Sequence, residues 1–545
     1  MLVVKKVNRW VNSTNIFSGK LPLVGVVTAT VLIGVGLIAL TRAATPAASI
    51  ELENGLLSSD VTNVSDVGAS GGKAIKFGSA VATGSLPFSL SSQTSLKGSP
   101  KKVFAHYFTP YPISLDNKAA AQDYYTINYN NPAGESNKFY AYGGFFRQRP
   151  LPRPVSAATT WQLDDMKTEV RRATNAGLDG FTLDILSLTG SNYDRMKLLL
   201  QAASETDPSF KIVLMPDGTS SATADVNTLA SSVAGLASQY NSLYKLADGR
   251  LVISPFAPER QGAAYWQNWV TIMKSTYNID VAFVPCFLNY SANVATFAPF
   301  SYGFSNWGNR SPATNQNIAT NINDAHARGK IWMQPVSLQD ERPSKSVYDE
   351  ANNTDNFRLT WSGATANNAD WIQIPTWNDY SEGAEIAPST HTGWSPLNLA
   401  SYYLSKFKFG TAPIISKDVL YVSHRVQLAG ATPDPAAGNT SLMQLRVGSS
   451  PARDTVEVLS FLKAPGNITV KIGSATYAYA APAGEFTQIY PLQVGIVTAN
   501  LSRSGTAVVS VDSPFNVLDL FTAQDEQYHF VSSALSNGIG DLNGN

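Results

Sequence analysis

The sequence predicts an α/β protein: a (β/α)8 TIM barrel with a C-terminal β-sandwich domain and an N-terminal signal or anchor segment. Three observations lead to this prediction. One long apolar run stands near the N-terminus, eight short apolar runs alternate with amphipathic stretches, and only strand-like runs follow them. The 545 residues are too many for one hydrophobic core. We expect segment boundaries at 1–48, 49–100, 101–412, 413–536 and 537–545.

The N-terminal segment predicts export. Lys5, Lys6 and Arg9 precede an apolar run over residues 21–40. About 20 apolar residues can span a bilayer as a helix, whereas the apolar core of a cleavable signal is normally about 7–15 residues long. Small residues follow at 41–48, where a peptidase could cut. We therefore expect an extracellular or cell-surface protein, with either a cleaved signal or membrane anchoring through residues 21–40.

Residues 49–100 are rich in Ala, Ser, Gly and Thr and contain two strand-like pieces, Ser49–Glu53 and Lys73–Phe77. Two interpretations stay open for this segment. It is either a linker with one hairpin or the remnant of a carbohydrate-binding β module.

The barrel prediction rests on eight apolar runs: Val103–Phe108, Gly180–Ile185, Lys211–Met215, Arg250–Ser254, Val281–Pro285, Ser301–Ser305, Lys330–Gln334 and Trp371–Pro375. Helical spacing fills the intervals, as in Leu163, Met166, Val170 and Ala173. Such alternation indicates right-handed βαβ units and a parallel sheet. The alternative is an open doubly wound sheet, but no dinucleotide-binding or P-loop glycine motif follows a strand.

After about residue 415 the amphipathic helices end and four strand runs appear among Gly and Pro residues: Val419–Val422, Thr455–Phe461, Ile468–Ile472 and Ala507–Val511. This pattern is typical of a β-sandwich. The tail Gly540–Asn545 resembles part of a calcium loop but lacks the final Glu, so we expect it to be disordered.

Charge and cysteine content exclude several classes of function. The 40 basic and 40 acidic residues balance, so no strongly basic face for nucleic acid is expected, and a neutral polysaccharide fits better. Cys286 is the one cysteine, lies in an apolar run and is interpreted as a buried hydrophobic residue. No metal-ligand spacing occurs. We expect no cofactor, no metal and a monomer.

Active sites of such barrels lie at the carboxyl ends of the strands. Six polar or aromatic residues are expected there as substrate-binding candidates: His106, Tyr107, Asp184, Asp217, Trp307 and Gln334. Simpler roles stay open for them. The acids could form salt bridges or cap helices, His106 could hold a neighbour, and Trp307 could cover the core.

The segment after the eighth run is the strongest signal. It contains two carboxylates, Asp379 and Glu382, as candidate catalytic residues, and Trp377, Asn378 and Tyr380 as candidate substrate contacts. Cleavage of a glycosidic bond needs one carboxyl group to protonate the leaving oxygen and a second to activate water or attack the sugar. Close carboxylates also push their pKa values apart. The alternative is that both acids cap a helix.

Three stretches resemble glycoside hydrolase family 71: Phe104–Tyr107, Gly177–Phe181 and, most specifically, Thr376–Glu382. The resemblance covers about residues 101–410. It implies a barrel with a C-terminal β-sandwich, α-1,3-glucanase (mutanase) activity with inversion, and Asp379 and Glu382 as the catalytic pair. We lean towards Asp379 as the acid and Glu382 as the base.

The segment departs from the family pattern at Ser381, where a Gly is expected, and in the Gly-Ala-Glu that follows Glu382. The Arg- and Pro-rich loop Phe146–Pro150 is also not typical of the fungal members. The related barrel endo-α-mannosidases are therefore an alternative. A non-catalytic glycan-binding surface protein is another alternative. A lyase or transferase would need a metal or nucleotide site that the sequence does not indicate.

Overall fold

The computed structural model describes residues 61–65, 73–77, 86–434 and 439–534. The chain divides into two compact units, residues 1–80 and 81–545. In the first unit β1 (Val61–Ser65) and β2 (Lys73–Phe77) form an antiparallel pair, which confirms the predicted strand at Lys73–Phe77. The predicted strand Ser49–Glu53, the apolar run 21–40 and the tail 537–545 lie outside the described residues. No helix among the described residues is long and apolar enough to cross a membrane.

The second unit contains one parallel sheet of nine strands, in the order β8-β7-β6-β5-β4-β14-β11-β10-β9. The strands are β4 (Lys102–Tyr107), β5 (Gly180–Ile185), β6 (Lys211–Pro216), β7 (Leu251–Ile253), β8 (Val281–Phe283), β9 (Cys286–Phe287), β10 (Gly303–Asn306), β11 (Ile331–Pro335) and β14 (Trp371–Ile374). All eight predicted runs are confirmed as strands. The fifth run forms β8, and β9 follows directly after the last residue of the run, Pro285, which has no N–H to donate.

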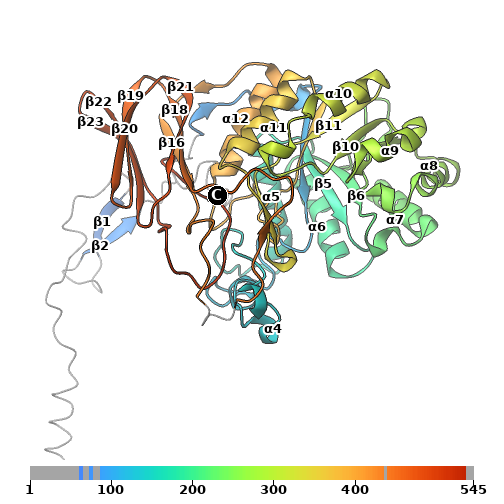
Figure 1. Cartoon of the computed structure of the whole chain (residues 1–545). Helices are drawn as coiled ribbons and strands as arrows, with labels where there is room; N and C mark the ends of the chain where they lie inside the picture. The colour runs from blue at the N-terminus through green and yellow to red at the C-terminus, as the bar shows by residue number, and fades with distance from the viewer. Residues whose placement is uncertain (1–60, 66–72, 78–85, 435–438, 535–545) are drawn as a thin grey trace, which may run out of the picture. The chain divides into compact units, whose positions relative to one another are not determined.

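Helices flank the sheet and separate its successive strands, except β8 and β9, which follow each other directly (Figure 1). They are α5 (Trp161–Asn175), α6 (Gly190–Thr206), α7 (Val226–Gln239), α8 (Ala263–Tyr277), α9 (Tyr290–Phe297), α10 (Ile318–Ala327), α11 (Asp355–Ala366) and α12 (Ser395–Phe409). The helix predicted from Leu163 to Ala173 is confirmed as α5, which buries Met166, Val170 and Ala173. Gly177, in the turn after α5, has a positive φ of 92°, a conformation that favours glycine.

Side chains alternate between the two faces of each strand, because the side-chain period of a strand is two residues. On β4 and β11, Phe104 and Met333 pack into a small core inside the sheet. Their neighbours Val103 and Trp332 face the helices and join the larger core. Cys286 is buried, as expected. This alternation decides which side chains can reach the concave face of the sheet.

Smaller elements connect the larger ones. A hairpin of β12 (Asp340–Arg342) and β13 (Val347–Asp349) follows β11, and β17 (Gln444–Leu445) pairs with it. Near the start of the unit, β3 (Phe88–Ser89) pairs with β15 (Ile414–Ile415). Two short helices, α3 (Gln93–Gly98) and α4 (Gly134–Asn137), precede α5.

The C-terminal part contains two four-stranded antiparallel sheets (Figure 1). One joins β21 (Gly484–Pro491), β18 (Thr455–Leu462), β16 (Val419–His424) and β24 (His529–Ser532); the other joins β20 (Ala475–Ala481), β19 (Gly466–Ile472), β22 (Val497–Arg503) and β23 (Thr506–Asp512). Buried side chains of both sheets, such as Val458 and Val470, share one apolar core. All four predicted strand runs are confirmed.

The core of the helix-flanked sheet continues into the C-terminal sheets. Tyr421, Phe461 and Phe530 from those sheets belong to the same buried cluster as Tyr402 of α12. Tyr402 and Phe461 contact edge to face, with ring centroids 4.7 Å apart. The predicted domain boundary between residues 412 and 413 therefore crosses a continuous core, and it stays a prediction.

Candidate active site

The segment after β14 folds into a closed loop at the carboxyl end of the sheet. The N–H of Thr376 donates to the carbonyl of Ala384 at 2.9 Å, and the N–H of Trp377 donates to the carbonyl of His106 on β4 at 2.7 Å. No helix begins until Ser395, the first residue of α12. Asp379 and Glu382 are therefore not helix-capping acids, and this alternative is excluded.

Asp379 is buried, with 6% of its surface exposed. Its Oδ1 accepts two hydrogen bonds from Ser381, one from the backbone N–H at 3.1 Å and one from the hydroxyl at 2.6 Å. Burial raises the pKa of Asp379, while the hydrogen bonds from Ser381 and the charge of Arg342 lower it. The carboxylate form is therefore stabilised on one oxygen, despite the desolvation.

Glu382 has two chemically different oxygens. Oε1 lies 2.7 Å from a guanidinium nitrogen of Arg342, whereas Oε2 is buried without a hydrogen-bond partner. Burial, followed by the charge of Asp379, raises the pKa of Glu382 to about 8. Two interacting carboxyl groups whose pKa values are raised are typical of acid–base sites.

Arg342 is a site residue that our sequence analysis did not identify. It comes from β12, and its guanidinium donates to both oxygens of Asp340, at 2.8 Å to Oδ1 and 2.6 Å to Oδ2. Asp340 also lies 3.3 Å from Arg446. Asp340 therefore balances much of the positive charge of Arg342, so that Arg342 neutralises the negative charge of Glu382 only in part. No short motif around residue 342 signals this role, because the contact depends on the β12–β13 hairpin.

Two further acids lie at this end of the sheet, and one of them, Asp184, interacts with Asp379. Asp184 at the end of β5 is buried, its Oδ1 has no hydrogen-bond partner, and burial and the charges of Asp217 and Asp379 raise its pKa well above the usual value. Asp217, which follows β6, accepts hydrogen bonds from the N–H and hydroxyl of Thr219 at 2.6 and 2.7 Å. The structure thus brings Asp184 close to both Asp379 and Asp217. The helix-cap alternative fails for Asp184, since residue 189 is the N-cap of α6.

His106 and Trp307 also meet here. Their rings contact edge to face with centroids 4.8 Å apart, and Trp307 makes a similar contact with Phe256. The buried guanidinium of Arg310 lies 5.4 Å from the centre of the Trp307 ring. Burial and the charge of Arg310 lower the pKa of His106 to about 3, so the imidazole is neutral. A neutral imidazole and a half-buried indole can contact a neutral sugar.

Three expected substrate contacts of the Trp377–Tyr380 stretch are instead buried supports. Trp377 is fully buried and donates from Nε1 to Glu169 of α5 at 2.9 Å. Asn378 is fully buried and donates to the carbonyls of Phe108 and Tyr111 at 3.0 and 2.8 Å. Tyr380 packs in a separate aromatic cluster with Tyr111. They position the loop and do not face open space.

Two other candidates face the helices. Tyr107 is fully buried and its hydroxyl donates to the sulfur of Met166 at 3.2 Å. Gln334 accepts from Trp332 Nε1 at 2.7 Å and donates to the carbonyl of Pro335 at 2.9 Å. The structure therefore does not bring either side chain to the carboxylates. Tyr111, which the sequence did not predict as a site residue, does lie beside the carboxylates. Its hydroxyl hydrogen-bonds with Ser381, and burial and the charge of Asp379 raise its pKa.

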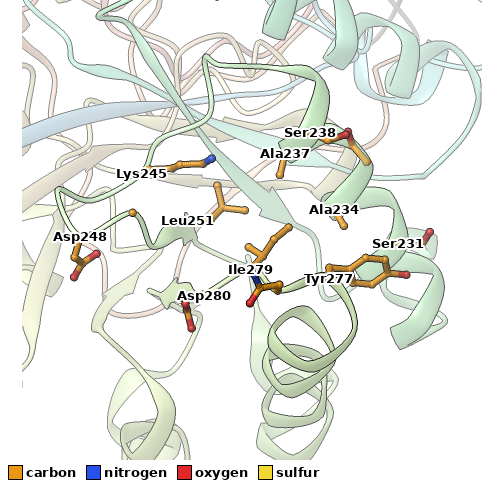
Figure 2. A pocket seen from close by; sticks show the side chains of 13 residues that line it. Ser231, Ala234, Ala237, Ser238, Lys245, Asp248, Leu251, Tyr277, Ile279 and Asp280 are labelled. Atoms are coloured by element: carbon orange, nitrogen blue, oxygen red, sulfur yellow. The ribbon is translucent and has the colours of Figure 1, made fainter.

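A groove of about 720 Å³ lies at the opposite, amino-terminal ends of β7 and β8. Figure 2 shows it between α7, the loop before β7 and the residues that follow α8. Its acids Asp248 and Asp280 form ion pairs with Arg250 and Lys274 at 2.8 and 2.7 Å. This groove contains none of the site residues described above and is far from the carboxyl ends where barrel chemistry occurs.

Comparisons with known proteins show which proteins this chain resembles. The chain is 25% identical over 383 residues to the glucan endo-1,3-alpha-glucosidase agn1 of Schizosaccharomyces pombe, covering 65% of this chain and 87% of that protein. It is 25% identical over 399 residues to a mutanase of Penicillium rubens, covering 67% and 84%.

Among solved structures, the GH99 endo-alpha-mannosidase of Bacteroides thetaiotaomicron has a TM-score of 0.45 and 13% identity, covering 56% of this chain and 97% of that chain. A likeness at this level supports no inference about activity. The profile of glycosyl hydrolase family 71 matches residues 154–530, which include the loop after β14. The chain therefore belongs to glycoside hydrolase family 71, and it is a glycosidase.

Proposed function

We propose that this protein hydrolyses α-1,3-glucan with inversion of configuration, using Asp379 and Glu382. The observation that carries the proposal is the interacting pair itself. Both carboxyl groups are largely buried, both pKa values are raised, and the charge of Asp379 contributes to the shift of Glu382. The two relatives named for α-1,3-glucan hydrolysis support the substrate, since most of each relative's length aligns with this chain.

The geometry favours Glu382 as the general acid and Asp379 as the general base. The pKa of Glu382 near 8 keeps its proton at neutral pH, and Oε2 is the oxygen without a partner. Asp379 already accepts two hydrogen bonds on Oδ1, which favour its ionised form. This order is the reverse of the one towards which the resemblance led us.

In the proposed reaction, Glu382 gives its proton to the glycosidic oxygen as the bond from that oxygen to C1 breaks. Water attacks C1 from the opposite face and gives a proton to Asp379. The products are a shortened chain with a free hydroxyl and a β-hemiacetal. An inverting site needs about 6.5–9.5 Å between the carboxyl groups to admit this water.

We also propose that the parallel sheet closes into the eight-stranded barrel. Residues 284–287 hydrogen-bond to both neighbouring strands: Val284 and Cys286 donate to Ile253 and Pro255 at 2.8 and 2.9 Å, and Ser305 and Trp307 donate to Pro285 and Phe287 at 2.9 and 2.8 Å. Together β8 and β9 thus act as the fifth strand between β7 and β10. The basic residues before the apolar run 21–40 support an extracellular or cell-surface location.

One experiment tests substrate and mechanism together. The secreted form is incubated with α-1,3-glucan, α-1,4-glucan, β-1,3-glucan and α-mannan, and the first products are recorded by proton NMR. We expect cleavage of α-1,3-glucan with the β-anomer appearing first. Early α-anomer would contradict inversion, and cleavage of α-mannan alone would favour the mannosidase alternative. Binding to α-1,3-glucan without cleavage would favour the glycan-binding alternative.

A further inference from the structure

Two imidazoles and one carboxylate meet where the loop after β14 contacts the chain that leads into β24. His391 comes from the loop, and Asp525 and His529 from the C-terminal chain. One ligand-capable atom of each residue lies within 4.8 Å of the other two. Asp525 Oδ2 is 3.0 Å from His529 Nε2 and 3.9 Å from His391 Nδ1. His391 lies 134 or more positions from the other two residues in the sequence, whereas Asp525 and His529 are four positions apart.

The cluster has unused capacity to bind a ligand. His391 Nδ1, which faces Asp525, is buried and has no hydrogen-bond partner, although buried polar atoms normally have one. His529 faces Asp525 through Nε2, which is hydrogen-bonded to Asp525 Oδ2 at 3.0 Å. The side chain of His529 is only 3% exposed. Asp525 Oδ1 accepts from the N–H of Gln527 at 3.0 Å, which leaves Oδ2 directed at the histidines. The side chain of His391 is 21% exposed, which gives access from solvent.

From this geometry we infer a binding site for a divalent transition metal of the zinc class, with His391, Asp525 and His529 as ligands. Imidazole nitrogens and a carboxylate oxygen are ligands that Zn²⁺ prefers, at about 2.0–2.2 Å from the ion. Ligand atoms on one such ion are roughly 3–4 Å apart, and the distances of 3.0 and 3.9 Å to Asp525 lie in this range. Water completes the coordination on the solvent side of His391.

Binding requires one movement. The rings of His391 and His529 are stacked, with centroids 4.1 Å apart and planes inclined by 23°. Lone pairs of nearly parallel rings do not converge on one point, so His391 turns out of the stack when the ion binds. Its position in a loop, with one side open to solvent, permits this rotation. The positive charge of Arg147 nearby is matched by Glu341 at 3.7 Å.

The proposed metal site lies next to the chain segment that packs against the loop after β14. Gln527 lies against Gly383, where an added Cβ would collide with its side chain. The N–H of Glu526 donates to the carboxylate of Glu341, whose own N–H donates to the carbonyl of Glu382 at 2.7 Å. A metal ion would therefore fix the chain next to Glu382. Its role is structural, and it takes no part in the hydrolysis proposed above.

The test uses the full chain without a polyhistidine tag, treated with a chelator and then dialysed. ZnCl₂ is titrated by calorimetry, and Co²⁺ is used as a second probe because its visible absorption reports imidazole ligands. We expect one equivalent of Zn²⁺ to bind, the melting temperature to rise, and His391→Ala to weaken binding more than about 100-fold, beyond the loss typical of outer-shell changes. His326→Ala, which removes an exposed histidine paired with Asp370 at 2.8 Å, should bind like wild type.

Several outcomes would overturn the inference. They are no saturable Zn²⁺ binding by the wild-type chain, equal binding by wild type and His391→Ala, or a Co²⁺ spectrum without nitrogen ligands. The cluster would then be a hydrogen-bonded pair of Asp525 and His529 with a stacked imidazole. If His529→Ala or Asp525→Asn does not fold, the wild-type titration and His391→Ala still decide. No substrate is used, so this result is independent of the proposed glucan hydrolysis.

Discussion

Two aspartates lie at opposite ends of β5, and their surroundings differ. Asp179 precedes the strand, and its Oδ2 accepts from the N–H of Val103 at 2.7 Å and from Lys408 at 2.6 Å. Its Oδ1 lies 3.8 Å from the ammonium of Lys102. Asp184 lies at the other end, with an unpartnered oxygen and a pKa raised by burial and neighbouring acids. Both residues are almost fully buried.

The difference indicates that the acid at the amino end of the strand stabilises the fold, whereas the acids at the carboxyl end serve the reaction. At the amino end of the strands, cations and backbone N–H groups neutralise the acid. At the carboxyl end, burial raises the pKa values of Asp184, Asp217, Asp379 and Glu382, and the guanidinium beside Glu382, that of Arg342, is shared with Asp340. A group of acids that is not fully compensated costs stability and is retained where a reaction needs it.

The largest expected effect on activity comes from replacing the proposed catalytic pair, Asp379 and Glu382. Glu382→Gln and Asp379→Asn should each lower kcat about 10²- to 10⁴-fold, because each removes one proton-transfer group. The melting temperature should stay close to wild type. Glu205→Gln, on the outer surface of α6, is the control and should keep full activity. Wild-type turnover on α-1,3-glucan in both variants would break the assignment.

Replacing Asp179, at the amino end of β5, should lower the stability and leave kcat unchanged. Asp179→Asn leaves the buried ammonium of Lys408 without its ionic partner and should lower the free energy of unfolding by about 3–5 kcal/mol. The kcat of the folded fraction should not change. Urea unfolding and activity assays measure the two quantities. Adding Lys408→Met should recover part of the stability, and a large loss of kcat in Asp179→Asn would contradict the division.

Asp184→Asn sharpens the same contrast at the other end of the strand. We expect kcat/KM to fall roughly 10- to 100-fold, because the amide cannot hold or give up the proton that the raised pKa of Asp184 retains. The free energy of unfolding should be unchanged or higher, since a buried carboxyl with an unpartnered oxygen is removed. If Asp184→Asn is strongly destabilised but keeps normal kinetics, the role of Asp184 is structural, like that of Asp179.

The pH dependence follows from the direction of the shifts. A general acid works only while it is protonated, so kcat/KM should fall as the pH rises through the pKa of Glu382 near 8. A general base works only while it is ionised, so activity should also fall on the acidic side, as Asp379 takes up a proton. A kcat/KM profile on soluble α-1,3-glucan oligomers measures both limbs. An activity that keeps rising above pH 9 would exclude Glu382 as the acid.

The smallest effect is expected at Ser381. Ser381→Ala removes the hydroxyl that donates to Asp379 at 2.6 Å, so the pKa of Asp379 should rise. One such hydrogen bond is worth about 1 kcal/mol, which moves the acidic limb upward by less than about one pH unit. Ser381→Thr keeps the hydroxyl and should leave the limb in place. An unchanged limb in Ser381→Ala would show that the backbone N–H alone sets the pKa.

The strands were predictable because each core strand is a short apolar run bounded by polar residues, and this pattern is local. The orientation of side chains was only partly predicted. Strand alternation already implies that Tyr107 faces the helices when His106 faces inward, as Phe104 does two residues earlier. Our prediction of Tyr107 overlooked that signal. For Gln334 the same logic holds, two residues after the outward-facing Trp332.

The site was predictable only where it follows a strand directly. Asp379 and Glu382 belong to one distinctive segment, but their neighbours Trp377 and Asn378 turn away to Glu169 and to the loop after β4. Adjacency in sequence therefore suggested contacts that the fold uses for support. Arg342 comes from β12 and Tyr111 from the loop after β4, and their contacts with the segment depend on tertiary structure that no local pattern encodes.

The core that continues from α12 into the C-terminal sheets has a consequence for how the molecule unfolds. Tyr402 packs on Phe461, and Phe530 belongs to the same cluster, so neither side can open without exposing apolar surface of the other. Residues 86–534 should therefore melt in a single calorimetric transition. A protease that nicks the surface loops should not release the C-terminal sheets as a separately folded fragment.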